Sequence, residues 1–305
     1  MMIDLPDTTA SAVRTELVRA SQRLGGLTTG MVLNLIIATD ESKQHDAVRA
    51  ASQAGREHPC RIIGVVARDP KAAPRLDAEI MVGEDAFQMV VLRCYGELID
   101  HADSVVEPLL VPDTPVVTWW PGAPPEAPAM APLGTLAQRR ISDAAASERP
   151  EQTLAHLAAG YRPGDTDLAW GRTTTWRSLL AAALDRPHGD ITAAAVGAEA
   201  GNPSAELMAA WLSDRLGVPV RRDVSDGPGV TCVIFVTSDG EIELSRPDGR
   251  NAMLSRPGEP DRYVALHRRD TVELLGEELR RLDPDEVYGE ALAALAAGGR
   301  AAGAR

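Results

Sequence analysis

Two apolar runs joined by a helical segment constrain the fold of this chain more than any other feature. Residues 32–38 and 60–67 are apolar at almost every position, which is typical of strands buried on both faces of a sheet. Asp40 is placed to cap a helix over 41–55 between them. Parallel neighbours need a crossover connection of about a dozen residues or more, so this order predicts a parallel βαβ unit.

The alternation of helices and strands extends to both sides of this unit. An amphipathic helix precedes it, with Val13 and Leu17 on the apolar face. Later elements are predicted as strands at 78–82, 89–94 and 116–120 and a helix at 97–106. Prolines and alanines at 121–132 cannot continue a sheet. We therefore predict an N-terminal α/β sheet domain over 1–122 and a Pro/Ala-rich connection over 123–132.

The remaining residues, 133–305, are predicted to form an α+β domain, which makes the chain as a whole α/β. Helices are predicted at 133–146, 151–158, 176–184 and 204–216, and a strand at 191–196. Asp-Gly pairs at 239–240 and 248–249 separate short apolar strands, a strong hairpin signal. The domain should therefore end in an antiparallel meander over strands at 230–236, 242–245, 253–255 and 263–267, followed by C-terminal helices at 271–282 and 285–296. The Ala/Gly-rich residues 297–305 are predicted to fray.

The charge of the chain argues against nucleic acid as a partner. The 305 residues carry a formal net charge of −13, which would repel a phosphate backbone. No apolar run is long enough to cross a bilayer, and the first residues, MMIDLPDTT, carry acid where a secretory signal carries base. These features predict a cytoplasmic globular protein without nucleic-acid or membrane partners.

Neither metal nor catalytic chemistry is indicated. Cys60, Cys94 and Cys232 are widely separated in strand-like segments, which predicts reduced core thiols and no dithiol, metal or cofactor site. The residue types of a hydrolytic triad occur together at Asp100, His101, Asp103 and Ser104. Because each helical residue turns by about 100° from the last, all three roles cannot converge from one turn. No catalytic residue is assigned.

Tryptophan and arginine are concentrated in a chain that is otherwise only 4% aromatic. Both types are enriched where proteins bind one another, so eight side chains are candidates for partner binding: Trp119, Trp120, Arg139, Arg140, Trp170, Arg172, Trp176 and Arg177. The alternative is that the tryptophans are core and strand-end residues and that the arginines form internal ion pairs. The sequence leaves both interpretations open.

Adjacent Trp119 and Trp120 end an apolar strand, just before a Pro-Gly turn. Side chains alternate along a strand, so the two indoles must point to opposite faces of the sheet. We expect one of them to be core and the other, Trp120, to be exposed. Its neighbours Val116 and Thr118 leave that assignment insecure.

A weaker candidate for binding phosphate lies at 196–204, where a strand runs through a glycine-containing loop into a helix. Gly197, Gly201, Asn202 and Ser204 are its residues, and a helix N-terminus offers free N–H groups to an anion. Asn202 or Ser204 is equally explained as an N-cap, and Glu199 would repel phosphate.

Four long blocks of this sequence resemble the bacterial glucose-6-phosphate dehydrogenase assembly protein family, OpcA. They are REHPCRI (56–62), YGELIDHADSVVEPLLVPDTPVVTWWPG (95–122), LAQRRISDA (136–144) and GDTDLAWGRTTTWRSLLAAALD (164–185). The resemblance implies a non-catalytic protein that promotes the oligomerisation or allosteric activation of the dehydrogenase in the oxidative pentose phosphate pathway. Glucose-6-phosphate dehydrogenase is thus the implied partner, and self-association is left open. The alternatives are an enzyme, or a sensor that binds a sugar phosphate or nucleotide at the loop from Gly197 to Ser204.

Overall fold

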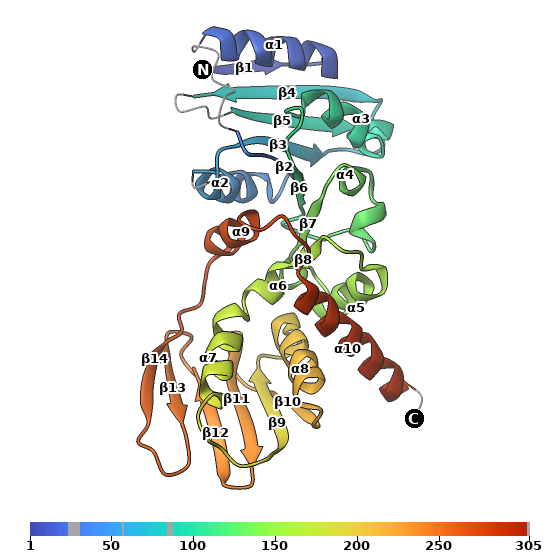
Figure 1. The fold of residues 1–305 in the computed structure, drawn as a ribbon. Coiled ribbons are helices and arrows are strands. Elements are labelled where there is room, and N and C mark those ends of the chain that lie inside the picture. The colour runs from blue at the N-terminus through green and yellow to red at the C-terminus, as the bar shows by residue number, and fades with distance from the viewer. Residues whose placement is uncertain (24–30, 57, 84–87, 304–305) are drawn as a thin grey trace. The chain divides into compact units, whose positions relative to one another are not determined.

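The protein divides into two compact units, each built from several segments of the chain. The computed structural model describes residues 1–23, 31–56, 58–83 and 88–303 (Figure 1). The first unit consists of Met1–Asp143, Gly164–Thr166 and Thr271–Pro284, and the second of Ala144–Pro163, Asp167–Asp270 and Asp285–Arg305. The division therefore does not fall at the Pro/Ala-rich connection over 123–132, which lies wholly within the first unit.

An eight-stranded sheet organises the first unit. Its strands are β1 (Met2–Leu5), β2 (Leu33–Asp40), β3 (Cys60–Ala67), β4 (Arg75–Val82), β5 (Gln88–Tyr95), β6 (Val116–Trp119), β7 (Arg139–Ser142) and β8 (Asp165–Asp167). Their order in the sheet is β1-β4-β5-β3-β2-β6-β7-β8. Strand β2 pairs in parallel with both β3 and β6, which confirms the predicted βαβ unit, and β1 and β4 pair antiparallel at one edge.

Without the two antiparallel edge strands, the order follows the doubly wound dinucleotide-binding pattern. Numbered in chain order, β5-β3-β2-β6-β7-β8 is strand order 3-2-1-4-5-6. The chain leaves β2 toward β3 on one side and leaves β6 toward β7 on the other. In such sheets ligands bind outside the carboxyl ends of the strands, at the point where the order reverses. Here that point lies between β2 and β6.

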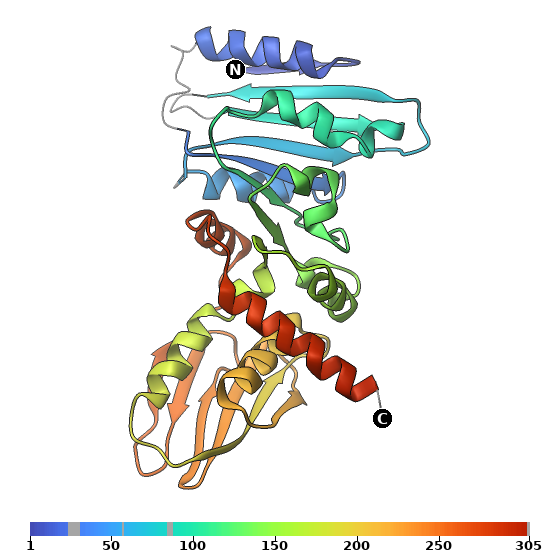
Figure 2. The same cartoon turned by 45° about the vertical axis from the view of Figure 1, so that its right-hand side comes forward.

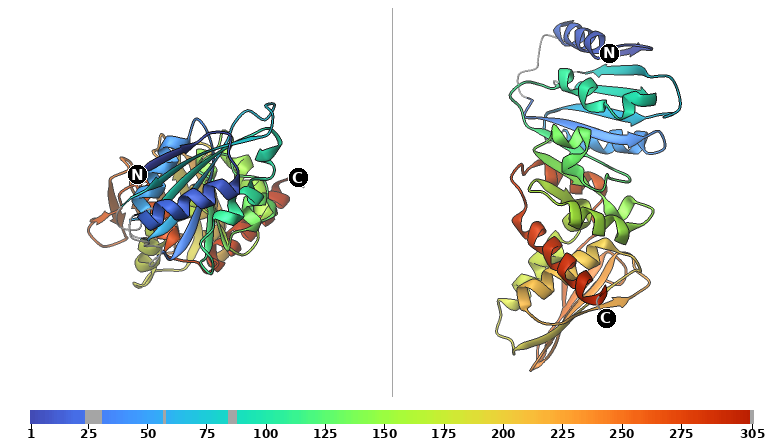
Figure 3. Two further views of the ribbon diagram at one scale, coloured as in Figure 1. Left: turned by 90° about the horizontal axis from the view of Figure 1, so that it is seen from above. Right: turned by 90° about the vertical axis from the view of Figure 1, so that its right-hand side faces the viewer.

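Helices cover both faces of this sheet, as a largely parallel sheet requires. They are α1 (Ala10–Arg23), α2 (Gln44–Ala54), α3 (Ala102–Val106), α4 (Pro132–Thr135) and α9 (Thr271–Leu279), with 3₁₀ turns η1 (Gly96–Ile99), η2 (Glu107–Leu109) and η3 (Pro128–Met130). Val13 and Leu17 of α1, Val105 of α3 and Leu133 of α4 pack in one core with residues of the strands. Helix α1 lies along β1 and β4 (Figure 3), while α2 packs on the opposite face of the sheet.

The second unit contains a six-stranded sheet. Its strands are β9 (Ile191–Ala198), β10 (Val220–Val224), β11 (Val230–Thr237), β12 (Gly240–Ser245), β13 (Asn251–Ser255) and β14 (Arg262–Ala265), in the order β10-β9-β11-β12-β13-β14. Strands β11 to β14 form the predicted antiparallel meander. Gly249 has φ +72° in the second of the predicted Asp-Gly turns, a conformation that favours glycine.

Five α-helices and a 3₁₀ turn complete the described part of the second unit. They are α5 (Pro150–Gly160), α6 (Leu168–Gly171), α7 (Thr174–Leu184), α8 (Pro203–Leu216) and α10 (Glu286–Gly303), with η4 (Ala144–Ala146). Helices α7 and α8 share a core with the sheet, and Figure 2 shows both on the same face of it. Helix α10 includes residues 297–303, which had been expected to fray.

Two helix predictions in the first unit are wrong. The segment 97–106 divides into η1 and α3, because the backbone at His101 has φ −116° and aspartate and histidine are weak helix formers. The segment 133–146 contains only one helical turn, α4, before Arg139–Ser142 joins β6 as the strand β7. Pairing with a strand already in place outweighs the helical propensity of this alanine- and arginine-containing stretch.

Candidate functional site

Both tryptophans of the strand-end pair are buried. Trp119 is 1% exposed and Trp120 is 7% exposed, so the expectation that one of them reaches the surface is wrong. The predicted alternation does hold, since Trp120 belongs to the core formed with α1, α3 and α4. Trp119 is in register with Ile37, and Ile37 with Gly64. A side chain at Gly64 would meet Val48 of α2, so helices cover the strand on both sides.

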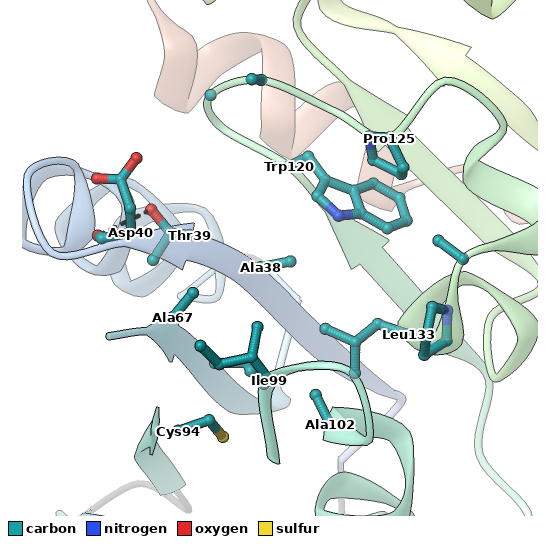
Figure 4. Close-up of a pocket in the computed structure, with 15 residues that line it drawn as sticks. Ala38, Thr39, Asp40, Ala67, Cys94, Ile99, Ala102, Trp120, Pro125 and Leu133 are labelled. Carbon is teal, nitrogen blue, oxygen red and sulfur yellow. Dashed lines mark hydrogen bonds between the residues drawn. The ribbon is translucent and has the colours of Figure 1, made fainter. Parts of the chain in front are cut away.

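The two indoles differ in what surrounds their nitrogen atoms. The Nε1 atom of Trp119 is fully buried and has no hydrogen-bond partner in the described structure. Trp120 instead lines a cavity, and its indole N–H has no partner among the described residues. The nitrogen of Trp120 lies on the edge of the ring that faces Ala38 and Thr39 (Figure 4). It is an unused donor directed into an open space.

This cavity has a volume of about 330 Å³ and lies at the carboxyl ends of the parallel strands. Ala38–Asp40 of β2, Ala67 of β3, Cys94 of β5 and Trp120 after β6 contribute to its walls, so it occupies the switch point of the sheet. Most of the remaining wall is apolar, from residues such as Ile99, Ala102, Pro125 and Leu133. Sequence reasoning missed this site, although the carboxyl ends of the predicted strands would have located it.

Asp40 is the last residue of β2 and lies at the edge of this cavity, before the turn that leads into α2. Its Oδ1 atom accepts hydrogen bonds from the backbone N–H of Ser42 at 2.8 Å and of Lys43 at 3.1 Å, and from the Ser42 hydroxyl. The Ser42 hydroxyl is the main cause that holds the pKa of Asp40 below its ordinary value. A charged carboxylate thus takes two N–H groups of the turn that leads from β2 into α2. The prediction that Asp40 caps a helix over 41–55 is wrong, because α2 begins only at Gln44 and its N-cap position, Lys43, has no side-chain cap.

Arg139 and Arg140 of β7 form internal ion pairs, which is the alternative that the sequence had left open. Arg139 is 2% exposed and donates to the Glu278 carboxylate at 2.6 Å and to the carbonyl of Asp283 at 3.0 Å. Arg140 pairs with the buried carboxylate of Asp165. Removal of either carboxylate would leave a buried cation without its ion-pair partner and would therefore destabilise the first unit.

Trp170 and Arg177 form a cluster inside the second unit. The Arg177 guanidinium lies 3.6 Å from the Trp170 ring centroid, and the Trp170 Nε1 atom donates to the Asp285 carboxylate at 2.8 Å. Tyr288 of α10 packs against Trp170 with ring centroids 5.9 Å apart. Trp170 is 1% exposed, whereas Arg172 and Arg177 are half-buried.

Trp176 is also buried, at 1% exposure, in the core between α7, α8 and the second sheet. The guanidinium of Arg246 lies 5.1 Å from the Trp176 ring centroid and donates to the carbonyls of Leu266 and Val230. Nothing in the sequence around Arg246 indicates this role, because its partners come from distant strands.

The loop from Gly197 to Ser204 has the predicted connection between a strand and a helix. Asn202 caps α8 by accepting from the Ala205 N–H at 3.1 Å, and its amide donates to Glu199 at 3.0 Å. Ser204 is buried and its hydroxyl has no partner in the described structure. The cap and the nearby carboxylate both oppose an anion here, and phosphate binding remains only a prediction.

Burial raises the pKa of all three cysteine thiols. Burial raises the pKa of Cys60 to about 12 and of Cys94 to about 11. Cys232 is half-buried rather than buried, and desolvation again raises its pKa. All three thiols are free, so no disulfide couples them.

The cluster of triad residue types does not form a catalytic arrangement. Asp100 follows η1, His101 precedes α3, and the Ser104 hydroxyl donates to the carbonyl of His101 at 2.8 Å. The serine hydroxyl therefore serves the backbone. Among the described residues no group of histidine, cysteine or carboxylate side chains is arranged to hold a metal ion. None of the described helices is long and apolar enough to cross a membrane.

Two adjoining family models cover most of the chain. The model described as the glucose-6-phosphate dehydrogenase subunit N-terminal domain matches residues 51–159, and the model described as the C-terminal domain of the same subunit matches residues 163–292. The chain belongs to this family, OpcA. The OpcA domains meet near residue 160, beyond the boundary predicted from the proline-rich segment.

Curated OpcA relatives are distant and longer than this chain. An OxPP cycle protein OpcA of Synechocystis is 29% identical over 138 residues, which is 42% of this chain and 29% of the relative. The OpcA protein of Nostoc punctiforme is 25% identical over 211 residues, which is 63% of this chain and 45% of the relative. The match thus spans less than half the length of either relative.

Solved structures with a similar course of the chain are oxidoreductases of low sequence identity. A mutant of KijD10, a 3-ketoreductase from Actinomadura kijaniata, is 12% identical, covers 88% of this chain and 96% of its own, and has a TM-score of 0.47. Biliverdin reductase from Synechocystis is 11% identical, covers 88% of this chain and 98% of its own, and has a TM-score of 0.44.

Proposed function

We propose that this protein is a non-catalytic assembly factor and allosteric activator of glucose-6-phosphate dehydrogenase in the cytoplasm. It supports the oligomerisation of the dehydrogenase and its activity in the oxidative pentose phosphate pathway. The observation that carries this proposal is the match of two adjoining OpcA domain models over 51–159 and 163–292. The separation of Asp100, His101 and Ser104 adds support, since these residues do not assemble a nucleophile with its base.

The buried tryptophans change how partner binding is best framed. Six of the eight candidate side chains are buried, so in this role they hold the shape of the partner-binding surface rather than touch the partner. Arg172 and Arg177 are half-buried and remain candidates for direct contact. Because Arg177 stacks on Trp170, substitution there would also disturb the fold. Arg172 is therefore the position chosen to test contact.

The decisive experiment combines size measurement with activity. The purified chain, the dehydrogenase of the same organism and their mixture are sized by light scattering, and nicotinamide reduction is assayed in each. We expect no turnover by the chain alone and a change in dehydrogenase size or activity in the mixture. Turnover by the chain alone that a single substitution abolishes, or a mixture indistinguishable from its components, would falsify the proposal.

Arg172→Ala should weaken the complex about tenfold or more, as truncation of an interface arginine commonly does. The matched control is Arg250→Ala, which removes an exposed arginine of the same unit. The melting temperature of each variant is measured alongside, so that lost binding is separated from lost folding. Equal binding by the two variants would exclude Arg172 as a contact and would leave the assembly role itself to the sizing experiment.

A further inference from the structure

We propose that the cavity at the switch point of the first sheet binds an uncharged purine nucleoside. It is formed by residues of the first unit alone, at the carboxyl ends of β2, β3 and β5 and just after β6 (Figure 4). Such crevices are where open α/β sheets bind ligands. The site and its ligand are separate from the proposed assembly role and can be tested on the chain alone.

The size and lining of the cavity favour a small flat molecule. Its volume of about 330 Å³ lies at the lower end of the range of roughly 300–1,000 Å³ for small-molecule sites, too small to enclose a whole dinucleotide. The Trp120 ring forms one wall, and Ile99, Ala102 and Leu133 supply apolar surface around it. A heteroaromatic base can stack on the indole and bury its faces against these side chains.

A polar group inside this apolar space gives the ligand its orientation. Trp120 is only 7% exposed, and its Nε1–H has no partner among the described residues. An unpaired donor directed into a cavity is matched by a ring nitrogen of a purine, which accepts a hydrogen bond. This hydrogen bond would give the Trp120 N–H a partner, which it lacks among the described residues.

The rim of the cavity selects against phosphate. Asp40 holds the turn before α2 through its Oδ1 atom, and no bond of the described structure goes to Oδ2. Thr39 and Asp40 line the same cavity. Their oxygen atoms would accept hydrogen bonds from ribose hydroxyls, as a carboxylate does at the ribose of a bound dinucleotide. A phosphate at this rim would meet the charged Asp40 carboxylate, which already takes the N–H groups of Ser42 and Lys43.

The test measures adenosine binding to the purified full chain by calorimetry, with AMP and NADP⁺ as comparison ligands. Adenosine should bind more tightly than either phosphate. The indole N–H proton signal of Trp120, assigned as the one lost in Trp120→Phe, should shift on addition of adenosine. Trp120→Phe keeps an aromatic wall but removes the donor, and it should weaken adenosine binding about fivefold to tenfold.

Asp40→Asn provides a second, independent variant. It retains an oxygen that can accept from the N–H groups of Ser42 and Lys43 but removes the charge, so the affinity for AMP should rise relative to that for adenosine by about tenfold or more. Asp248→Asn is the matched control, because Asp248 caps a turn of the second unit by accepting from Arg250 and Asn251 and lines no part of this cavity. It should change neither ligand. The inference is overturned if adenosine does not bind at millimolar concentration, if Trp120→Phe binds it unchanged, or if AMP or NADP⁺ binds the native chain more tightly.

Discussion

Trp120 in the first unit and Trp170 in the second are both nearly inaccessible, yet their indoles are used differently. Trp170 donates its N–H to Asp285, carries the Arg177 guanidinium on one face and packs against Tyr288. Trp120 has an apolar environment, an unpaired N–H and a cavity in front of it. Two tryptophans that are almost equally buried therefore differ in whether the indole N–H has a hydrogen-bond partner.

The difference shows that a buried tryptophan can have all of its hydrogen-bonding and packing partners within its unit or can lack one of them. Every part of the Trp170 side chain meets a partner within its unit, so its energetic role is stability. The N–H of Trp120 has no partner among the described residues, so it can donate to a molecule in the cavity. Four measurements test this difference and the packing of the described units, and their expected effects decrease in turn.

The largest effect on stability should come from truncation of a buried tryptophan to alanine. Trp119→Ala and Trp170→Ala should each lower the free energy of unfolding by about 3–5 kcal/mol, because each empties a packed site. Tyr263→Ala removes an aromatic residue that is 84% exposed and should change the unfolding free energy by less than about 0.5 kcal/mol. Urea unfolding measures all three. A native-like stability for Trp119→Ala would contradict its place in the core.

The hydrogen bond itself is isolated by the milder change to phenylalanine. Trp170→Phe removes the donor to Asp285 Oδ2, while Oδ1 keeps its bond from the Tyr288 N–H, and it should cost about 1–3 kcal/mol more than Trp120→Phe, which breaks no such bond. Pairing Trp170→Phe with Asp285→Ala in a double-mutant cycle measures the coupling directly. Equal losses at the two positions would mean that the N–H of Trp170 contributes nothing beyond packing.

The stacked cation should have a smaller effect. Arg177→Met retains an unbranched apolar chain over the Trp170 ring but removes the charge, and it should lower the unfolding free energy by about 0.5–2 kcal/mol. Arg250→Met, at an exposed position, serves as the reference. If the two variants unfold alike, the contact at 3.6 Å contributes no measurable stability.

The smallest effect is expected from the cysteines at neutral pH. The pKa of Cys94 is raised to about 11 and that of Cys60 to about 12, so alkylation by iodoacetamide should be very slow at pH 7 and accelerate above pH 10. The raised values also contribute stability that is complete below about pH 9 and is lost as the pH rises through 11 to 12.

A redox comparison completes that measurement. Activation of the dehydrogenase should not respond to reductant in the native protein or in Cys60→Ser, Cys94→Ser and Cys232→Ser, since the thiols are free and not paired. A response that one of these variants abolishes would overturn the structural interpretation of the cysteines.

Local patterns determined much of this protein. The run 60–67 is the strand β3 with the same bounds, and the Asp-Gly pair at 239–240 lies in the hairpin between β11 and β12. The order of strand, helix and strand fixes a parallel pair, although α2 begins at Gln44 and is not capped by Asp40 as predicted. The confirmed outcomes depend on residues close in sequence, so periodicity and turn chemistry are sufficient to find them.

Only the tertiary structure decided which tryptophans are buried and what the arginines bind. Arg139 pairs with Glu278, 139 residues along the chain, and its segment becomes a strand because β6 is beside it. Alternation correctly placed Trp119 and Trp120 on opposite faces, but helices from distant parts of the chain cover both. Burial and partner choice depend on non-local packing, and no local pattern of residues records it.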